Sequence, residues 1–428
     1  MSDHPQATRR DFLKGSTLAA AGFALAGGLN VARSAHAAGS EEMKIVLIGC
    51  GRRGTGAVGN CLSSVQGVKL IAVADAFKDR AEACVRELKK VHADRIDVPE
   101  ERMFIGFDAY QKAIAADPDV VMIATPPGFR PIHYAAAVAA NKNIFMEKPC
   151  CVDAPGYRSL LETNKLADQK NLKVVVGLQR HYQKPYVEAM KRIHDGGLGD
   201  LTLLRAYWNG GNIWFRDRKP GQTEMEYQMR NWYHFVWLCG DNICEQHIHN
   251  LDVCNWAKNA HPIAANGMGA CVRRYANRDP KKGLGQIFDE HFVEFTYPDG
   301  TKMYSQCRQM DGTTFHGVFE AIHGTKGVID SHRFHGGRDP YEQEHIALFE
   351  AIRNNERHND AHYAATSSFT SVLGRMATYS GRLVKWDEAA AKGPSEAPAK
   401  YAFDADPPVK PDAEGRYPIP VPGIYKPY

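Results

Sequence analysis

The sequence lacks a zinc-type cysteine spacing, internal repeats and a hydrophobic run long enough to cross a membrane. Its ten cysteines include the adjacent pair Cys150-Cys151, which does not suit an ordinary disulfide framework. We therefore expect reduced thiols, buried as small hydrophobic groups. The apolar stretch 18–29 is shorter than the roughly 20 residues that a membrane-spanning helix needs. The formal net charge of +4 excludes a polyanion-binding surface, and therefore nucleic acid as a partner.

The N-terminal segment carries the three parts of an export signal. Residues 8–14 read Thr-Arg-Arg-Asp-Phe-Leu-Lys, which resembles a twin-arginine motif. The apolar run 18–29 follows, and Ala35-His36-Ala37 fits the small-x-small pattern of a cleavage site. We expect residues 1–37 to be a twin-arginine signal peptide and the mature protein to be periplasmic or otherwise exported, meeting the membrane only during export. Cleavage removes four basic and two acidic side chains, so the net charge falls from +4 to +2.

Strands and helices alternate along residues 41–178. Apolar runs predict strands at 44–48, 68–74, 120–124, 143–146 and 174–177, with helices that include 81–91, 131–140 and 156–169. Such alternation predicts a doubly wound parallel sheet with helices on both faces. The expected fold class is therefore α/β, with a Rossmann domain at 41–178.

The pattern changes at about residue 179. After a helix at 185–194, alternating runs predict strands at 202–208, 291–297, 303–308 and 314–323, with turns at Pro298-Asp-Gly300 and Gly324-Thr-Lys-Gly327. Helices are expected at 341–353 and 361–385. Residues 179–390 thus predict a second, α+β domain with a large and mostly antiparallel sheet. Residues 391–428 hold nine of the 23 prolines and predict an extended arm, lying along its own domain or against a neighbouring subunit.

A glycine-rich turn follows the first strand. It reads Gly49-Cys-Gly51-Arg-Arg-Gly54, and Asp75 ends the second strand 21 residues after the last glycine. The first glycine allows the turn, the second lets a pyrophosphate approach the backbone, and the third lets helix and strand pack closely. Free N–H groups at the start of the next helix then face the phosphates. A carboxylate at Asp75 would bind the adenosine ribose hydroxyls and repel a 2′-phosphate, so we predict NAD over NADP.

Arg52 and Arg53 lie inside this turn and are expected to contact the dinucleotide, where they could weaken that preference. Twin-arginine export carries proteins that are already folded, and the cell exterior holds no nicotinamide pool. We therefore expect the cofactor to be held tightly and recycled within the active site.

The run Thr125-Pro-Pro127, His133 and residues 143–149 (Asn-Ile-Phe-Met-Glu-Lys-Pro) resembles the Gfo/Idh/MocA family, which includes glucose-fructose oxidoreductase and inositol dehydrogenases. Gly177-Leu-Gln-Arg180, with Pro185 and Gly197-Leu-Gly-Asp200, resembles the join between that family's two domains. The resemblance covers residues 43 to about 385 and implies an NAD-binding domain. The cofactor contacts that it implies are Thr125, Pro126, His133, Glu147 and Lys148.

The resemblance also places Lys148 beside the nicotinamide ring and the reacting hydroxyl. An ammonium group there can stabilise a developing alkoxide or take part in a proton relay. Pro149 favours an extended backbone at Lys148, at the strand end where ligands bind in such sheets. The alternative is a lysine paired with Glu147 on a surface loop.

Family members commonly carry an Asp and a His four residues apart, and Glu245 and His249 are the matching positions here. At that spacing we expect them on one face of one helix. With a pKa near its ordinary value, His249 would be the general base that takes the hydroxyl proton. Glu245 is longer than the usual Asp and either orients His249, binds a substrate hydroxyl or acts as a second acid or base.

His247 lies off this helix face and is expected to be structural or at the rim of the site. Together with Glu245 and His249 it also raises the question of a metal site. One helix face presents only Glu245 and His249, and no other ligand can be assigned, so no metal is expected.

The segment between Trp208 and Trp237 mixes aromatic rings with amide and guanidinium groups. This mixture suits a carbohydrate, whose C–H faces stack on rings while its hydroxyls need directional partners. The same rings could instead fill the core or a subunit interface. The candidate substrate-binding residues are Trp214, Arg216 and His234 in this segment, and Arg180, Tyr182 and Asp252 elsewhere.

The sequence therefore predicts an exported, NAD-dependent oxidoreductase that acts on a sugar or cyclitol. An NAD-dependent glycosidase, which oxidises and re-reduces its sugar within one cycle, is the enzymatic alternative. A non-catalytic sugar or nucleotide sensor on the same fold is the second alternative. An open sheet face and a proline-rich arm favour a homo-oligomer.

Overall fold

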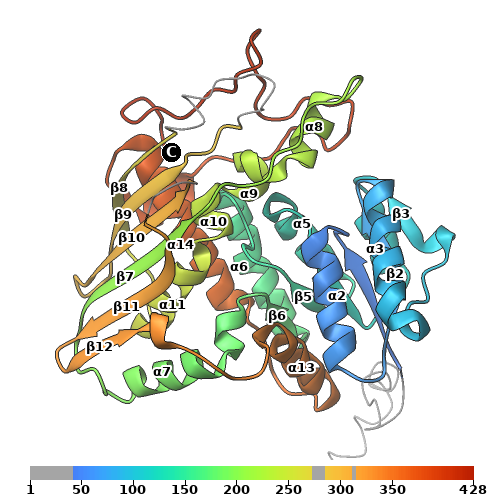
Figure 1. Cartoon of the computed structure of the whole chain (residues 1–428), viewed down its shortest axis with the longest axis horizontal. Coiled ribbons are helices and arrows are strands. Elements are labelled where there is room, and N and C mark those ends of the chain that lie inside the picture. Colours follow the sequence, from blue (N-terminus) through green and yellow to red (C-terminus); the bar gives the residue numbers. More distant parts are fainter. Residues whose placement is uncertain (1–41, 272–284, 311–314) are drawn as a thin grey trace, which may run out of the picture. The chain divides into compact units, whose positions relative to one another are not determined.

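Two β-sheets with helices packed between and around them organise the described part of the chain (Figure 1). The computed structural model describes residues 42–271, 285–310 and 315–428, so the predicted signal peptide lies outside the described residues. Glu42–Tyr428 form one compact unit. Within the described ranges, no helix has the length and apolar character needed to cross a membrane.

The first sheet has six parallel strands in the order β3-β2-β1-β4-β5-β6. The strands are β1 (Met43–Ile48), β2 (Val68–Asp75), β3 (Met103–Ile105), β4 (Val120–Ile123), β5 (Asn143–Met146) and β6 (Val174–Val176). The helices are α2 (Arg52–Ser64), α3 (Lys78–His92), α4 (Ala109–Ala115), α5 (Arg130–Ala139) and α6 (Ala154–Gln169). Because helices cover both faces, the strands are buried along most of their length and form continuous apolar runs. The predicted doubly wound sheet is confirmed.

β3 and α4 are absent from the sequence prediction. β3 has only three residues, all half-buried, and α4 has only seven, so neither is long enough to establish a periodic pattern. The loop between them carries Gly106 and Phe107, which line the cavity described below.

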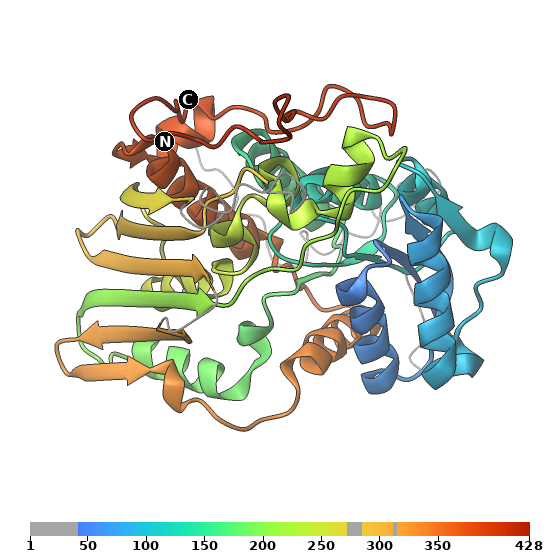
Figure 2. The same ribbon diagram turned by 45° about the horizontal axis from the view of Figure 1, so that its top comes forward.

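The second sheet has seven strands in the order β12-β11-β7-β10-β9-β8-β13 (Figure 2). The strands are β7 (Leu201–Gly210), β8 (Ala264–Ala270), β9 (Glu290–Thr296), β10 (Lys302–Gln309), β11 (Gly317–Gly324), β12 (Gly327–Asp330) and β13 (Val384–Lys385). Among the described pairs of this sheet, β7 with β10 is parallel and the others are antiparallel, which confirms the predicted mostly antiparallel sheet. The first residue of the strand expected at 314–323 lies outside the described residues.

The helices of this second part are α7 (Lys184–His194), α8 (Glu224–Arg230), α9 (Val236–Cys239), α10 (Asn242–Glu245), α11 (Ile248–Lys258), α13 (Pro340–Arg353), α14 (Ala361–Ser380) and α15 (Trp386–Lys392). The expected helix 361–385 is wrong at its C-terminal end. α14 stops where Gly381 takes a left-handed φ of +66°, and Val384–Lys385 then pair with β8. Apolar residues beyond the turn, such as Leu383 and Val384, extended the helical pattern past its true end.

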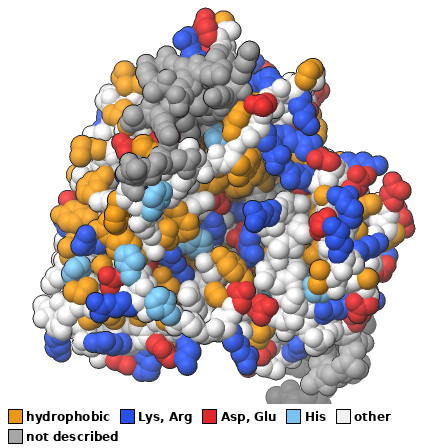
Figure 3. Space-filling view, viewed as in Figure 1, with side chains coloured by type: hydrophobic (Ala, Val, Ile, Leu, Met, Phe, Trp, Pro, Cys, Tyr) orange, Lys and Arg blue, Asp and Glu red, His pale blue; other side chains and the backbone are white. Residues whose placement is uncertain are grey.

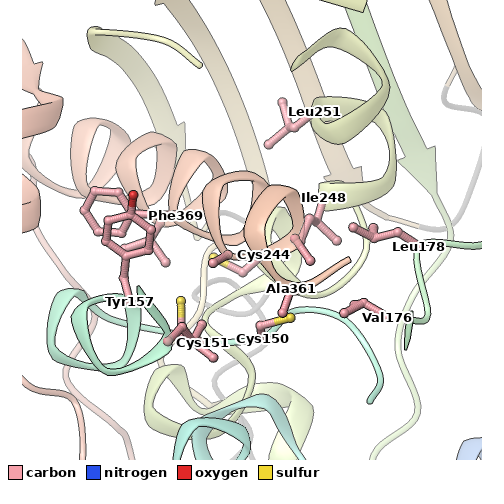
Figure 4. Close-up of a cluster of buried hydrophobic side chains, with 14 of the residues drawn as sticks. Cys150, Cys151, Tyr157, Val176, Leu178, Cys244, Ile248, Leu251, Ala361 and Phe369 are labelled. Carbon is pink, nitrogen blue, oxygen red and sulfur yellow. The ribbon is translucent and has the colours of Figure 1, made fainter. Parts of the chain in front are cut away.

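α14 is buried on nearly all sides because it lies in the core that joins the two sheets. In Figure 4 its Phe369 faces Tyr157 of α6, and the two rings stack with centroids 4.4 Å apart. Cys150, Cys151 and Cys244 lie in the same core. All ten cysteines are free thiols and nine are buried, which agrees with the expected packing role.

The C-terminal arm packs against other parts of its own chain. Figures 1 and 2 show it (red) running past α8. The Gln228 side chain donates to the Val409 carbonyl at 2.7 Å. At its start the arm places Glu396 Oε1 3.2 Å from Nη2 of Arg375, whose side chain is fully buried in α14.

Candidate active site

The carboxyl ends of the parallel strands open into a cavity of about 880 Å³. The loops after β1, β2, β4 and β5 form one wall, and parts of residues 208–249 with Tyr341 form the other. The predicted residues that line it are Gly49, Gly51, Arg52, Arg53, Asp75, Thr125, Pro126, His133, Glu147, Lys148, Trp214, Arg216, Glu245 and His249. The structure thus brings together most of a set drawn from both parts of the chain.

The glycine turn fits a dinucleotide. Gly49 has φ +100°, and a methyl group on it would lie 2.5 Å from Thr125 N. A methyl on Gly54, behind the cavity wall, would lie 2.0 Å from the Gly49 carbonyl, so loop and helix are in direct contact. Gly51 has no atom within 4 Å on that side and faces open space. Gly51 is also the N-cap of α2 without a side-chain cap, so the first N–H groups of the helix remain for phosphate oxygens.

Asp75 lies at the end of β2, where the sequence placed the ribose-binding carboxylate. Its Oδ2 accepts from Cys50 N at 2.8 Å and its Oδ1 from Phe77 N at 2.9 Å. Burial raises the pKa of Asp75, and these two backbone donors oppose that rise. The carboxylate keeps lone pairs for the ribose hydroxyls, so the position of Asp75 also fits a bound dinucleotide.

Arg53 is bound on two sides by carboxylates. Its Nε donates to Glu147, and its Nη2 lies 3.1 Å from Glu344 Oε1. Burial raises the pKa of Glu344 well above its ordinary value, and the neighbouring Glu147 charge adds to this rise. Burial also opposes ionisation of Glu147, but Arg53, Lys148 and Arg130 together hold its pKa below the ordinary value.

The loop after β4 is held by a buried arginine that the sequence did not single out. Arg130 Nη2 donates to the Thr125 carbonyl at 2.7 Å, and Nη1 donates to the Pro149 carbonyl. Thr125 Oγ1 lies 3.2 Å from His133 Nδ1. Arg130 thus joins the two loops that carry the expected cofactor contacts.

Lys148 does not pair with Glu147, so that alternative is wrong. Its Nζ donates to Glu245 Oε1 at 3.0 Å and to the Glu245 carbonyl at 2.5 Å. The side chains of Lys148 and Glu245 are only 13% and 14% exposed. The pair therefore lies inside the cavity, where solvent screens its charges little.

Glu245 and His249 are not on one helix, which corrects the prediction. α10 ends at Glu245 and α11 begins at Ile248. At the join His247 N donates to the Asn242 carbonyl, five residues back, and His249 N to the Gln246 carbonyl, three residues back, so the regular four-residue hydrogen bonding is interrupted. Both side chains still reach the cavity. The four-residue spacing suggested a helix face, whereas the break turns two short helices towards the same space.

The expected ordinary pKa of His249 is also wrong. Burial lowers its pKa well below the ordinary value, and the charges of Lys148, Arg180 and Arg53 add to the effect. The ring stacks on Trp208, with centroids 5.8 Å apart. The lowered pKa favours the neutral ring, whose Nδ1 has no hydrogen-bond partner among the described residues.

Arg180 and Tyr182 do not line the cavity, contrary to the expectation for substrate contacts. Arg180 Nη1 forms a buried ion pair with Glu320. Tyr182 OH donates to Asp360 Oδ2 at 2.5 Å. Both side chains serve packing between η4 (Gln179–Tyr182) and neighbouring elements.

Asp252 and His234 also lie away from the cavity lining. Asp252 Oδ2 is 2.8 Å from His181 Nε2, and its Oδ1 accepts from Ser367 Oγ at 2.7 Å. His234 Nε2 is 2.8 Å from the Trp214 carbonyl, so it supports a cavity residue without lining the cavity itself. The sequence shows that both side chains are polar, but it does not show which residues they contact.

Trp214 and Arg216 do line the cavity, and the guanidinium of Arg216 lies 5.4 Å from the Trp214 ring centroid. Sequence reasoning did not name Trp208, Trp232, Gln246 or Tyr341 as site residues, yet they line it too. The aromatic density of residues 208–237 was a signal for the two tryptophans. Nothing in the sequence near Tyr341, on α13, pointed to it.

His247 is buried, with Nε2 2.7 Å from Ser305 Oγ, and does not line the cavity. Within the described ranges, no group of three or more His, Cys, Asp or Glu side chains is placed to hold a metal ion.

Three buried histidines should make the fold acid-sensitive. Burial lowers the pKa of His133, His247 and His345 to about 3 each. Below pH 6.5 the unfolded chain binds protons that the folded chain does not, so the free energy of unfolding should fall as the pH drops towards 3. Each histidine adds up to about 1.4 kcal/mol per pH unit.

His345 offers a direct test, because neither ring nitrogen has a hydrogen-bond partner in the described part of the chain. Its ring packs on Phe145, with centroids 4.4 Å apart, so leucine should be tolerated. We expect His345→Leu to lose about 2 kcal/mol less stability than the wild type between pH 7 and pH 5. Urea unfolding at the two pH values measures this, with the exposed His335→Leu as control. Equal losses in all three proteins would contradict it.

The fold agrees with comparisons to known proteins. Residues 43–178 match the Gfo/Idh/MocA model, described as an oxidoreductase family with an NAD-binding Rossmann fold. The inositol 2-dehydrogenase of Klebsiella pneumoniae is 28% identical over 164 residues, 38% of this chain and 45% of that protein. The scyllo-inositol 2-dehydrogenase (NAD(+)) of Bacillus subtilis is 27% identical over 304 residues, 67% of this chain and 77% of that protein.

A solved structure shows the same fold over most of the chain. Scyllo-inositol dehydrogenase from Lactobacillus casei, with bound NAD(H) and scyllo-inositol, is 19% identical with a TM-score of 0.62. The match covers 81% of this chain and 100% of that chain. Residues 43–178 of the chain carry the NAD-binding Rossmann domain of the Gfo/Idh/MocA oxidoreductase family. The matched part of the chain spans less than half the length of the Klebsiella relative.

Proposed function

We propose that this protein is an exported NAD-dependent oxidoreductase that oxidises a hydroxyl of a sugar or cyclitol. The observation that carries the proposal is the convergence of Lys148, Glu245 and His249 in a cavity that also holds the dinucleotide-type turn. The inositol dehydrogenases among its relatives support the substrate class. So do the aromatic rings of Trp208, Trp214 and Trp232, which offer apolar faces to a sugar ring.

NAD, when bound, supplies the hydride acceptor. Neutral His249 accepts the proton of the substrate hydroxyl through a ring nitrogen. The Lys148 ammonium donates a hydrogen bond to the same oxygen and stabilises the negative charge that develops on it. Glu245 holds that ammonium in place and balances its charge in the dry interior of the cavity. Because the base and the cation act on one oxygen, hydride loss from the adjacent carbon is favoured.

An NAD-dependent glycosidase is the second candidate, and the position of Glu245 favours it. Such an enzyme oxidises the sugar transiently, eliminates the aglycone, adds water and returns the hydride, so it needs no external nicotinamide. The Glu245 carboxylate beside Lys148 can supply the additional acid or base. A non-catalytic sensor is a third possibility, which the joint presence of Lys148 and His249 in the cavity disfavours.

The export part of the proposal rests on residues 1–37, which lie outside the described residues. The twin-arginine pattern, the apolar run and the Ala-His-Ala site support a periplasmic or otherwise exported location. Fractionation of cells that express the full chain tests this; a mature protein found only in the cytoplasm would contradict it.

We also propose a homo-oligomer. The outward face of the second sheet exposes Met268, Phe292, Tyr304 and Val318, an apolar surface of the kind that a second subunit covers. Sedimentation of the purified mature protein decides the point, since a monomer at micromolar concentration would contradict it.

The deciding experiment is mass spectrometry of the nucleotide released when mature protein, purified after native export, is denatured. We expect near-stoichiometric NAD, and the holoenzyme is then screened with cyclitols, free sugars and aryl glycosides together. Net formation of NADH or of an oxidised product indicates the oxidoreductase, whereas aglycone release without net NADH indicates the glycosidase. Recovery of no nucleotide, with no NAD binding on titration, would contradict both enzymes and leave the sensor.

A further inference from the structure

A separate hydrophobic cluster covers the Asp75 side of the cavity. It combines side chains from the rim of the first sheet, from residues 214–238 and from the arm. We call residues 214–238 and 401–417 together the roof. The members drawn from the three sources include Phe77, Phe107 and Phe129; Met225, Met229, Trp232 and Trp237; and Tyr401, Phe403, Val409 and Tyr417. The roof is thus built from parts of the chain that lie far apart in sequence.

The arm supports the cavity wall from behind. Phe403 lies 5.4 Å from Phe77 and 4.9 Å from Phe107, measured between ring centroids. Tyr401 lies 5.4 Å from Phe129. Phe77, Phe107 and Phe129 all line the cavity, so the arm fixes three rings of its wall.

One ion pair fastens the roof to the first sheet's helices. Arg230, at the end of α8, pairs with Asp79, in the first turn of α3, through two nitrogen–oxygen contacts of 2.8 Å each. The same guanidinium lies 3.7 Å from the Phe77 ring centroid. The Asp79 side chain is 62% exposed, so the ion pair alone contributes little, but the cation–π contact of Arg230 with Phe77 adds to it.

Two further arginines face the cavity, Arg80 from α3 and Arg216 from the roof itself. Figure 3 shows Lys and Arg side chains (blue) gathered beside α8. Arg80 and Arg216 line the cavity, and neither forms an ion pair with a residue of the described ranges. Burial lowers the pKa of Arg216, and the nearby positive charges of Arg80 and Arg230 lower it further. An anionic ligand in the cavity would relieve this repulsion.

We propose that the roof retains the dinucleotide as a resident group through many turnovers, with Asp79–Arg230 as its latch and Arg80 and Arg216 as contacts for its phosphates. The inference rests on the proposed function, since it takes NAD as the ligand. The bound dinucleotide would lie between the glycine turn and the roof, and its release would require the ring contacts of the arm to separate. The roof residues are therefore determinants of cofactor retention and take no part in the chemical step.

The test is exchange of the bound cofactor. Holoenzyme is mixed with an excess of isotopically labelled NAD, and the mass of the bound nucleotide is followed with time. We expect slow exchange in the wild type and exchange at least about tenfold faster in Arg230→Ala and in Phe403→Ala, a factor that corresponds to 1.4 kcal/mol. Arg86→Ala is the matched control, because Arg86 is an exposed arginine of α3 that lies outside the roof, does not line the cavity and pairs with its neighbour Glu87.

A charge exchange guards against a merely structural effect. The double variant Asp79→Arg with Arg230→Asp should exchange its bound NAD slowly, as the wild type does. Asp79→Arg alone and Arg230→Asp alone should both exchange it faster. Exchange at the wild-type rate in Arg230→Ala and Phe403→Ala would overturn the proposal. So would a wild type that exchanges within the mixing time while still turning over substrate, and that result would leave the proposed function intact. A protein that binds no NAD at all would instead contradict the proposed function.

Discussion

Lys148→Met should lower kcat by about 10³-fold while the affinity for NAD changes only a few-fold. Methionine has a similar length but no charge, so the variant loses the cation that stabilises the developing alkoxide. The glycine turn and Asp75, which we propose as the dinucleotide site, lie on other loops and stay intact. Steady-state kinetics and NAD titration of the same preparation measure the two quantities separately.

The control must account for Glu245, whose carboxylate loses its partner when Lys148 is replaced. Lys148→Met combined with Glu245→Gln removes both charges, so a loss of turnover in this well-folded double variant is not due to a stranded carboxylate. Lys165→Met removes an exposed lysine paired with the exposed Glu162 and should behave like the wild type. Turnover by Lys148→Met within tenfold of the wild type would contradict the proposed mechanism.

Single alanine substitutions at the glycines of α2 and its preceding loop should separate dinucleotide binding from folding. At Gly51 a methyl group meets no atom within 4 Å and enters the cavity, so Gly51→Ala should keep its stability and weaken NAD binding by about 100-fold. At Gly54 the methyl would lie 2.0 Å from the Gly49 carbonyl, and backbone must move. Gly54→Ala should therefore lose NAD binding and several kcal/mol of stability together.

Gly59 provides the matched control in the same helix. A methyl there meets nothing within 4 Å and does not face the cavity, so Gly59→Ala should be neutral or stabilising by up to about 1 kcal/mol. NAD titration and thermal unfolding of the three variants complete the test. Equal NAD affinity in Gly51→Ala and Gly59→Ala would show that the pyrophosphate does not approach Gly51.

The sequence was sufficient for five of the six strands of the first sheet and for its glycine turn because both are local patterns, whereas β3 was too short to be found. Continuous apolar strands separated by helices define a parallel sheet, and the positions of Gly49, Gly51 and Gly54 follow from backbone contacts within one turn. Lys148 could be placed because strand ends meet at one edge of such a sheet. These predictions depend on residues close in sequence.

The remaining parts of the site depend on contacts between distant segments. The break between α10 and α11 leaves no mark in the pattern of apolar residues. The four-residue spacing of Glu245 and His249 therefore predicted one continuous helix, which the structure does not have. Arg180 found its partner Glu320 140 residues away, and its charge alone suggested a substrate contact. Tyr341 reaches the cavity only because α13 packs beside α2. Single-sequence patterns carry no information on such pairings.

The ion pair between Arg375 and Glu396 joins the buried helix α14 to the arm, which follows α15 in the chain. Arg375 is fully buried, and its guanidinium is balanced by a carboxylate that lies after the last helix. A chain that ends before residue 396 would leave an unpaired charge inside the core, which costs several kcal/mol. The buried charge is therefore balanced only after residue 396 has been added to the chain. The proposed twin-arginine route carries folded proteins. A chain that lacks residue 396 would be destabilised by its unpaired buried charge and would therefore be a poorer substrate for that route.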